Sequence, residues 1–499
     1  MDKKRAVLIL WFVFVLCSVA FMSVRWLATY YSGISIQEIL FHIAMPLEGT
    51  SKDLIDSFLR EVLAPVGTLS LALLVFGLFG ARRSVDIDFS FPSSTVSLRL
   101  RGAIMVNSFF IVFSIFSIGF ASAELIESFG VINYIRYATA STDLYTNEYI
   151  DPANVAFKFP ATKRNLVLVF LESVESSFFL QEDGGNYSDD LMPEFAALAK
   201  ANVHFSDSDV LGGANQVGGT GWTIAALVAH TMGIPLVLPF YGNAYQGYDE
   251  FLPGAKGLTD ILGAAGYEQR FLIGSDKKFA GRDTLFETHG NVLVKDTTYY
   301  KNAGLVPPDY SVWWGFEDQK LYSLAKRELT ELAAGDKPFN VMLLTVDTHH
   351  VGGYVCELCD DEFDEQYKNV LACASRQAQD FVSWIQRQAW FENTAIVLVG
   401  DHFYMDGSFL PVGAKRRTYN VYINPFSHPV RSVYRDFSTL DTLPSILDSL
   451  GVSYDAPGLG LGRSLFKDTQ TLLEQYGKAS IDQELSKKNK EYDRFLYGE

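Results

Sequence analysis

The sequence predicts an α/β fold with a mainly parallel sheet flanked by helices, preceded by three membrane-spanning helices. Three observations support this: uncharged stretches of membrane-spanning length lie in the first quarter of the chain, short apolar runs follow later, and helical patterns separate those runs. A continuous apolar run of strand length is typical of a parallel strand buried on both faces. Strands that alternate with helices indicate one sheet covered by helices on both faces.

The uncharged stretches occupy residues 6–24, 62–81 and 102–123. Each is long enough to cross hydrocarbon as a helix, because about 20 residues rising about 1.5 Å each span about 30 Å. The first could instead be a cleaved signal peptide, but its apolar run is long and two further stretches follow. We therefore expect residues 1–124 to form a membrane anchor.

The distribution of basic residues predicts the orientation of this anchor. The N-terminus and the loop 82–101 together hold seven Lys or Arg residues, whereas the loop 25–61 holds three. Because cytoplasmic loops carry the excess of basic residues, the N-terminus and the loop 82–101 are expected inside the cell. The third span then delivers the rest of the chain to the outer side of the membrane.

The remainder of the chain is predicted to be one acidic domain. Residues 125–163 are expected to form a juxtamembrane connector, 164–466 the folded domain and 467–499 a charged C-terminal tail. From residue 125 onward the chain holds 31 basic and 49 acidic residues, a net charge of −18. Such a surface repels polyanions, so we expect no nucleic-acid binding. An anionic substrate must be held locally, by a metal ion or a few basic side chains.

Three cysteines, Cys356, Cys359 and Cys373, lie in the large domain. An oxidising compartment favours one disulfide among them and leaves one thiol over. Cys356 and Cys359 could instead be half of a zinc site, but no second pair or matching histidine spacing follows. The sequence does not choose the pairing.

The apolar runs that predict the sheet cover residues 165–171, 267–273, 340–346, 394–400 and 420–423. Helical patterns between and after them cover residues 319–332, 376–388 and 440–450. Ligands of such sheets gather at the carboxyl ends of the strands. The polar residues that directly follow the runs are therefore the first candidates for a functional site.

Acidic residues and histidines follow three of these runs. In chain order they are Glu172, then Asp347, His349 and His350, then Asp401 and His402. Carboxylate oxygens with one imidazole suit a divalent ion such as Mn²⁺ or Mg²⁺, and would also accept Zn²⁺. Helix capping or pairing with arginine is the alternative role, but the joint placement at strand ends favours a metal site.

A glycine-rich turn, GGTGWT at residues 218–223, precedes an apolar helical stretch. Such a turn presents a hydroxyl together with free backbone N–H groups, which suits a phosphoryl group. Thr220 has glycine on both sides and is the hydroxyl that we expect to be exposed. Thr223 is expected to be a helix-turn residue.

Together these residues resemble the membrane-anchored phosphoglycerol transferases of the alkaline phosphatase/sulfatase superfamily. The resemblance covers about residues 160–466 and rests on GGTGWTIAALVAHTMGIPL (218–236), TVDTHHVGGY (345–354), GDHFYM (400–405) and LGLGRSLF (459–466). Two branches are similar: lipoteichoic acid synthase, and phosphoglycerol transferase I of osmoregulated periplasmic glucan synthesis, which is the closer match. The resemblance implies a sulfatase-like domain that faces the periplasm from the bacterial inner (cytoplasmic) membrane.

Carried over residue by residue, the resemblance implies a metal set and a nucleophile. The implied metal ligands, of which Thr220 is also the nucleophile, are Glu172, Thr220, Asp401 and His402. His349 matches a family histidine that contacts the phosphoglycerol group or the reacting oxygen, and Arg282 matches an arginine that holds substrate. The neighbouring tryptophan of the lipoteichoic acid branch is Ala280 here, which weakens the polymerase interpretation.

Three further residues have weaker predictions. His350 is expected to support or line the substrate site, and His289 to reach it, each with a purely structural role as the alternative. Glu175, one helical turn from Glu172, is the alternative metal ligand and is otherwise expected to be solvated.

The resemblance implies metal-dependent transfer of phosphoglycerol from membrane phosphatidylglycerol to a glucan or related polysaccharide. A phosphothreonine-type covalent intermediate and one divalent ion, Mn²⁺ or Mg²⁺, belong to that activity. Polyglycerolphosphate synthesis and phosphoethanolamine transfer are alternatives on the same scaffold. Sulfate-ester hydrolysis is disfavoured because no Cys or Ser lies in a C/S-x-P-S-R context, and a non-catalytic membrane sensor because all four metal positions are filled.

Overall fold

The computed structural model describes residues 3–31, 34–44, 50, 52–80, 83–91, 94–237 and 250–498. Within it the chain forms two compact units, one of residues 1–32 and 51–132 and one of residues 33–50 and 133–499. Residue 81, at the end of the second predicted span, and residue 499 of the predicted tail lie outside the described residues.

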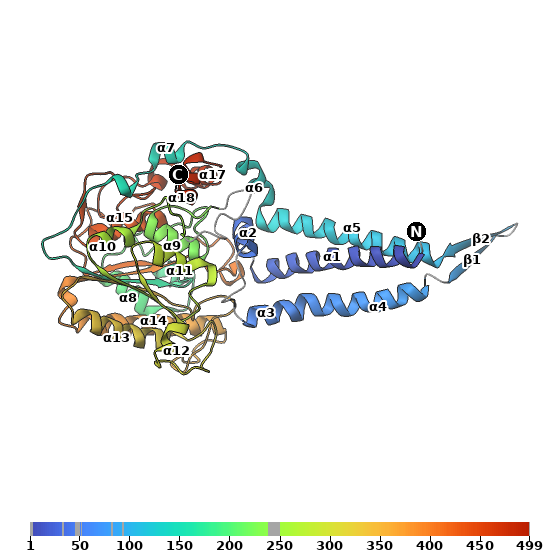
Figure 1. Cartoon of the computed structure of the whole chain (residues 1–499), viewed down its shortest axis with the longest axis horizontal. Coiled ribbons are helices and arrows are strands. Elements are labelled where there is room, and N and C mark those ends of the chain that lie inside the picture. Colours follow the sequence, from blue (N-terminus) through green and yellow to red (C-terminus); the bar gives the residue numbers. More distant parts are fainter. Residues whose placement is uncertain are drawn as a thin grey trace. The chain divides into compact units, whose positions relative to one another are not determined.

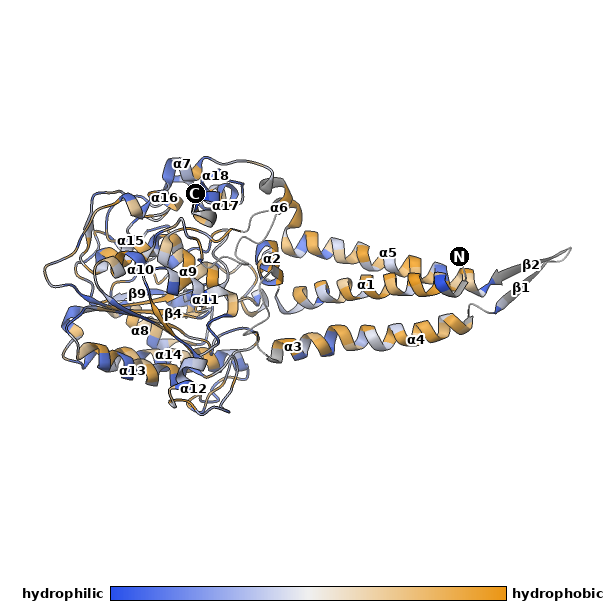
Figure 2. Cartoon of the chain, viewed as in Figure 1, coloured by the Kyte–Doolittle hydropathy of each residue, from blue (hydrophilic) through white to orange (hydrophobic). Residues whose placement is uncertain are grey.

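The first unit consists mainly of long apolar helices (Figure 2). Its elements are α1 (Lys3–Tyr30), α3 (Lys52–Phe58), the π-helix η1 (Leu59–Leu63), α4 (Ala64–Gly80), β1 (Ser84–Phe91), β2 (Ser94–Arg101) and α5 (Gly102–Phe129). Three stretches, Arg5–Tyr30, Leu54–Phe79 and Gly102–Phe129, are long and apolar enough to cross a membrane. Only 22% of the most apolar window of each is buried within the protein. Such exposed apolar surface is expected of helices that lie in lipid.

The second unit is built on a six-stranded sheet. The strands of this unit are β3 (Phe157–Lys158), β4 (Asn165–Leu171), β5 (Glu268–Ile273), β6 (Leu293–Lys295), β7 (Phe339–Leu344), β8 (Thr394–Gly400), β9 (Asn420–Ile423) and β10 (Ser453–Tyr454). The order in the large sheet is β6-β5-β7-β4-β8-β9. All of its neighbours pair in parallel except β9, which is antiparallel to β8. The short strand β6 has no counterpart among the predicted runs.

Helices cover both faces of this sheet (Figure 1). The helices of the second unit are α2 (Ile36–Ala44), α7 (Leu144–Glu148), α8 (Pro193–Ala201), α9 (Thr223–Met232), α10 (Leu258–Ala264), α11 (Arg282–Thr288), α12 (Thr297–Asn302), α13 (Asp318–Ala333), α14 (Gln366–Gln386), α15 (Thr442–Ser449), α16 (Leu472–Tyr476), α17 (Lys478–Leu485) and α18 (Lys490–Tyr497); in sequence, α6 (Val131–Ala138) spans the boundary between the units. On one face lie α8, α13 and α14, and on the other lie α9, α10 and α15 (Figure 1).

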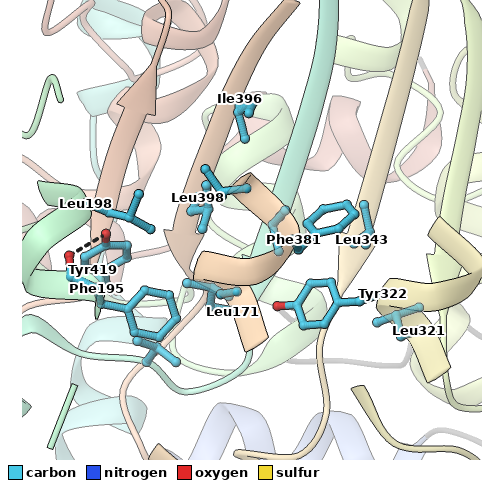
Figure 3. Packing of buried hydrophobic residues seen from close by; sticks show 14 of the residues in the cluster. Leu171, Phe195, Leu198, Leu321, Tyr322, Leu343, Phe381, Ile396, Leu398 and Tyr419 are labelled. Carbon is cyan, nitrogen blue, oxygen red and sulfur yellow. Dashed lines mark hydrogen bonds between the residues drawn. The ribbon is translucent and has the colours of Figure 1, made fainter. Parts of the chain in front are cut away.

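Closely packed apolar side chains hold the strands in place. Leu171, Leu343 and Leu398 from three neighbouring strands pack with Phe195 of α8 and Phe381 of α14, and all five are at most 2% exposed (Figure 3). Burying one such side chain contributes about 1.5–3 kcal/mol. The strand ends that carry the polar residues are therefore held on a rigid support.

The predicted C-terminal tail is part of the second unit. Leu472, Ile481 and Phe495 of its helices are buried. Arg435, which is fully buried, donates a hydrogen bond from Nε to Oε1 of Glu474 over 2.7 Å. An ion pair of this kind needs its partner, because an unpaired buried charge is costly. The tail therefore belongs to the fold that supports the strand ends.

We expect a specific cysteine pairing. Cys359 and Cys373 form a disulfide, and the buried Cys356 is a free thiol whose Sγ lies 3.5 Å from Sγ of Cys359. Non-reducing peptide mapping should find the Cys359–Cys373 link and a Cys356 thiol that reacts only after denaturation. In Cys373→Ser we expect Cys356 to pair with Cys359, because the two sulfur atoms are already adjacent. Free thiols at all three of Cys356, Cys359 and Cys373 in the wild type would contradict this assignment.

Candidate active site

Three neighbouring strands end at one polar cluster. Leu171 pairs with Gly400 in the β4–β8 ladder, so Glu172 and Asp401 follow side by side. The Asp401 N–H donates to the carbonyl oxygen of Leu171 over 3.2 Å. On the other side, the Glu172 N–H donates to Oγ1 of Thr345, which follows β7, over 2.9 Å. The parallel sheet thus brings residues from distant parts of the sequence to one edge.

Glu172, Asp401 and His402 together have the geometry of a metal-binding group. One ligand atom from each lies within 4.8 Å of the others, and none of the three residues is more than 2% exposed. Nε2 of His402 lies 3.3 Å from Oε1 of Glu172 and 3.5 Å from Oδ2 of Asp401. Nδ1 of His402 bonds to the carbonyl oxygen of Phe403 over 2.8 Å, which orients Nε2 toward the carboxylates.

The charges of this cluster fit a cation. Oδ1 of Asp401 accepts backbone hydrogen bonds from Ser173 and His402 over 2.8 and 2.7 Å, whereas the buried Oδ2 accepts none. Burial and the nearby Glu172 raise the pKa of Asp401 to about 7. Although burial opposes protonation of His402, the carboxylates of Asp401 and Glu172 raise its pKa to about 10. Two buried carboxylates with an imidazole and an unsatisfied oxygen are a donor set for one divalent ion.

Thr223 supplies a hydroxyl to this cluster. It is the first residue of α9, and its Oγ1 donates to Oε2 of Glu172 over 3.4 Å and lies 3.3 Å from Nε2 of His402. Every residue of Ile224–Met232 is buried, which fixes the helix. The N-terminus of a helix carries partial positive charge, which stabilises an anion that forms there.

Thr220 does not join the cluster. Its Oγ1 donates to the carbonyl oxygen of Val217 over 2.8 Å and accepts from the N–H of the same residue, and Thr220 is fully buried. The turn is compact because Gly219 has φ of 78° and a Cβ there would lie 2.8 Å from Cβ of Pro235. The expectation that Thr220 presents the exposed hydroxyl is wrong, since its side chain closes the turn. The hydroxyl beside Glu172 and His402 belongs to Thr223.

His349 lies beside the cluster. Its ring is 4.7 Å from that of Trp314, and its Nδ1 bonds to the carbonyl oxygen of His350. Burial lowers the pKa of His349, although the charge of Glu172 opposes this shift. His349 is therefore a neutral imidazole within electrostatic reach of the carboxylates.

Arg282 lies near the same group and is only 5% exposed. Its guanidinium donates to the carbonyl oxygens of Asp276 and Phe279 over 2.6 and 3.1 Å. Burial lowers its pKa to about 10, and the charge of Glu172 works against that shift. Arg282 thus remains a cation at neutral pH, as an anionic substrate requires.

The other two predicted substrate residues, His289 and His350, differ in position. Nδ1 of His289 lies 3.0 Å from Oδ2 of Asp260, and its Nε2 bonds to the carbonyl oxygen of Phe251. Both ring nitrogens are committed within a buried contact, so the expectation that His289 reaches the site is wrong. His350 is buried with Nδ1 3.2 Å from Oη of Tyr404, which places it in a supporting position.

Glu175, the alternative to Glu172 as a ligand, has a structural role. Its carboxylate is fully buried and binds the guanidinium of Arg416, with Nε 3.0 Å from Oε2. It also accepts the N–H of Tyr404 over 3.0 Å. The expectation that Glu175 is solvated is therefore wrong as well.

Sequence reasoning missed one element of this region altogether. Helix α2 lies in the loop between the first two spans, yet its Phe41 ring is 5.9 Å from that of Trp222, the residue before Thr223. The sequence signal for this helix was weak, because it is an apolar stretch of only nine residues that follows a serine, Ser35. In the structure Ser35 caps the first turn: its Oγ accepts a hydrogen bond from the Glu38 N–H over 3.2 Å. Only the tertiary structure shows what α2 touches.

Comparison with known proteins identifies relatives of this chain. The sulfatase family model matches residues 164–452, which is more than half of the chain. Phosphoglycerol transferase I from Escherichia coli O6:K15:H31 is 31% identical over 328 residues, 64% of this chain and 41% of that protein. Phosphoglycerol transferase I from Shigella flexneri is 32% identical over 313 residues, 61% of this chain and 39% of that protein. The chain thus matches about two-fifths of the length of these curated relatives.

A solved structure has a similar fold. The integral membrane lipooligosaccharide phosphoethanolamine transferase A from Neisseria meningitidis superposes with a TM-score of 0.50 at 14% identity, over 98% of this chain and 88% of that one. At that identity the likeness concerns the fold alone. The three helices that are long and apolar enough to cross a membrane indicate a membrane protein. The predicted resemblance and α/β fold are confirmed, and the chain belongs to the sulfatase family.

Proposed function

We propose that this protein is a metal-dependent transferase that moves phosphoglycerol from phosphatidylglycerol to a glucan or related polysaccharide. The observation that carries this proposal is the Thr223 hydroxyl, held at a helix N-terminus beside Glu172 and His402. Similarity to proteins named phosphoglycerol transferase I supports the choice of group transferred. A membrane anchor suits a lipid donor, because it holds the site near the plane in which the donor is dissolved and raises the effective donor concentration.

Glu172, Asp401, His402 and Thr223 would hold one divalent ion, Mn²⁺ or Mg²⁺. Such an ion acts as a Lewis acid that makes a hydroxyl more acidic and neutralises phosphate oxygens. The protein contributes fixed ligands on rigid strand ends. Arg282, as a buried cation, would bind the phosphate of the donor.

In the first step Oγ1 of Thr223 attacks phosphorus in line, which forms the Oγ–P bond and breaks the bond to the diacylglycerol oxygen. The proton that leaves the threonine hydroxyl ends on that oxygen, with His349 proposed as its carrier. In the second step an acceptor hydroxyl attacks phosphorus and gives up a proton. The Oγ–P bond breaks, and Thr223 regains a proton.

The same proposal includes the location of the site. The excess of basic residues at the N-terminus and in the loop 82–101 supports an orientation with the catalytic domain outside the cytoplasm. The disulfide between Cys359 and Cys373 is compatible with an oxidising compartment. We infer the periplasmic face of a bacterial inner membrane.

Offering an acceptor separates a transferase from a hydrolase. We expect the full chain, in vesicles with headgroup-labelled phosphatidylglycerol and Mn²⁺, to label β-glucan oligosaccharide and to release diacylglycerol faster when glucan is present. Water is present at about 55 M, so a transferase must bind and orient its acceptor, which can supply effective molarities far above that. The measurement is the ratio of labelled glucan to free glycerol phosphate, with phosphatidylcholine vesicles as control.

The other products of this assay decide between the alternatives. Free glycerol phosphate alone, whichever sugar is offered, would exclude the transferase while leaving the nucleophile and the metal set in place. Growing glycerol phosphate chains would indicate polymer synthesis. In a parallel assay with headgroup-labelled phosphatidylethanolamine, transfer of that label would indicate phosphoethanolamine transfer.

A further inference from the structure

Helix α2 (Ile36–Ala44) belongs to the same compact unit as the sheet, although in sequence it lies between the first two spans. Glu38, Ile39 and Phe41 on one side of it are at most 8% exposed. Leu40 and Ile43, on the other side, are 38% and 75% exposed. One face of α2 is thus packed into the unit, as an amphipathic helix packs on a core.

The packed face touches the turn that carries the nucleophile. Phe41 contacts Trp222, which directly precedes Thr223. Glu38 lies within electrostatic reach of His402. Beside this contact is a cavity of about 260 Å³, and its lining includes Ser35, Glu38, Gln216, Trp222, Lys478 and Asp482. A cavity below the 300–1,000 Å³ of typical ligand pockets suits a small polar group.

The other contact of α2 leads to the substrate side of the site. The ring of His42 stacks on Phe279 with centroids 5.9 Å apart and planes 23° apart. Phe279 lies 5.3 Å from the ring of Trp314, which lies 4.7 Å from that of His349. The guanidinium carbon of Arg282 is 5.4 Å from the Phe279 centroid. His42 therefore extends an aromatic wall that already holds the two residues assigned to substrate.

We propose that α2 forms one wall of the donor-headgroup pocket and that His42 binds a hydroxyl of the glycerol headgroup, which makes it a specificity-determining residue. This inference rests on the proposed function and deepens it. It also gives the loop between the first two spans a role in substrate selection.

The chemistry of His42 fits an uncharged hydroxyl. Neither ring nitrogen of His42 has a hydrogen-bond partner among the residues that the structure describes. Burial lowers its pKa to about 4, so it is neutral at neutral pH. A neutral imidazole donates from one nitrogen and accepts at the other, as glycerol hydroxyls require. The ammonium of an ethanolamine headgroup only donates, so it would leave the imidazole N–H unpaired.

The test uses the full chain in phosphatidylglycerol vesicles, with KM and kcat measured from diacylglycerol release. For His42→Ala we expect KM to rise about 3- to 10-fold, the loss expected for one neutral hydrogen bond, with kcat and Tm close to wild type. His42→Asn, which can still donate and accept, should recover part of the affinity. Ile43→Ala, a change at the exposed neighbour on the same helix, is the matched control and should behave as wild type.

Two results would overturn the inference. One is an unchanged KM in His42→Ala, and the other is a fall in kcat and Tm without a change in KM, which is the mark of a structural role. If the wild type releases no diacylglycerol, the proposed function fails. Binding of sn-glycerol 1-phosphate, measured by tryptophan fluorescence, then tests separately whether α2 lines a pocket for the headgroup. Weaker binding in His42→Ala but not in Ile43→Ala would retain the α2 assignment. Equal binding in both variants, or none in the wild type, would reject it.

Discussion

Thr223→Ala is expected to abolish diacylglycerol release from phosphatidylglycerol, with a loss of about 10⁴-fold or more, as removal of a nucleophile causes. The reason is placement: the Thr223 hydroxyl is the one beside Glu172 and His402. Thr220→Ser should retain most activity, because it keeps the hydroxyl that closes the turn on Val217. The measurement is the initial rate of diacylglycerol release in vesicles.

A trapped intermediate gives an independent result for the same hydroxyl. Protein quenched in acid during turnover should carry a phosphoglycerol adduct that peptide mass spectrometry locates on Thr223. An adduct on Thr220, or full activity in Thr223→Ala with loss in Thr220→Ser, would show that the nucleophile is assigned to the wrong threonine. Thr223→Ser, which retains a hydroxyl, should keep a measurable rate.

Asp401→Asn is expected to remove both turnover and stabilisation by divalent ions. In the wild type an ion at 100 times its Kd adds about 2.7 kcal/mol to the free energy of unfolding, provided that it binds only the folded state. Asp401 and Glu172 are adjacent buried carboxylates that repel each other when both are charged. The variant removes one of these charges, so without metal it should be at least as stable as the wild type. Thermal unfolding in MnCl₂ and in EDTA measures both effects.

The control for this experiment is Asp309→Asn, a change at an exposed aspartate outside the site. It should keep the full shift in Tm on adding Mn²⁺. A metal-induced shift that survives in Asp401→Asn, or full turnover of the wild type in excess EDTA, would contradict the assignment of the metal set.

The strands and the residues that follow them were predictable because their signals are local. Runs such as 165–171 and 394–400 are continuously apolar, so both their type and their carboxyl ends can be found in the sequence. Parallel pairing then implies that Glu172, Asp401 and His402 meet. No knowledge of loops or side-chain rotamers is needed for that step.

The choice between the two threonines was not predictable in this way. It depends on where α9 begins and how the turn before it folds, and a remote segment helps to set both. The Gly218 N–H donates to Oδ1 of Asp482, in a C-terminal helix, over 2.9 Å. The prediction that His289 reaches the site failed for the same reason, since its partner Asp260 lies in a remote element, helix α10. Long-range contacts of single polar atoms leave no periodic pattern in a sequence.

The position of α2 also bears on drug discovery. Screens against membrane-anchored enzymes often use a water-soluble fragment trimmed at the last span. Here such a fragment would begin beyond Phe129 and would lose residues 36–44, although Phe41 is fully buried against Trp222. Its aromatic wall would be open to water where the intact protein is closed. Inhibitors selected on the fragment would fit a cleft that the cell never presents, and those that need α2 would be missed.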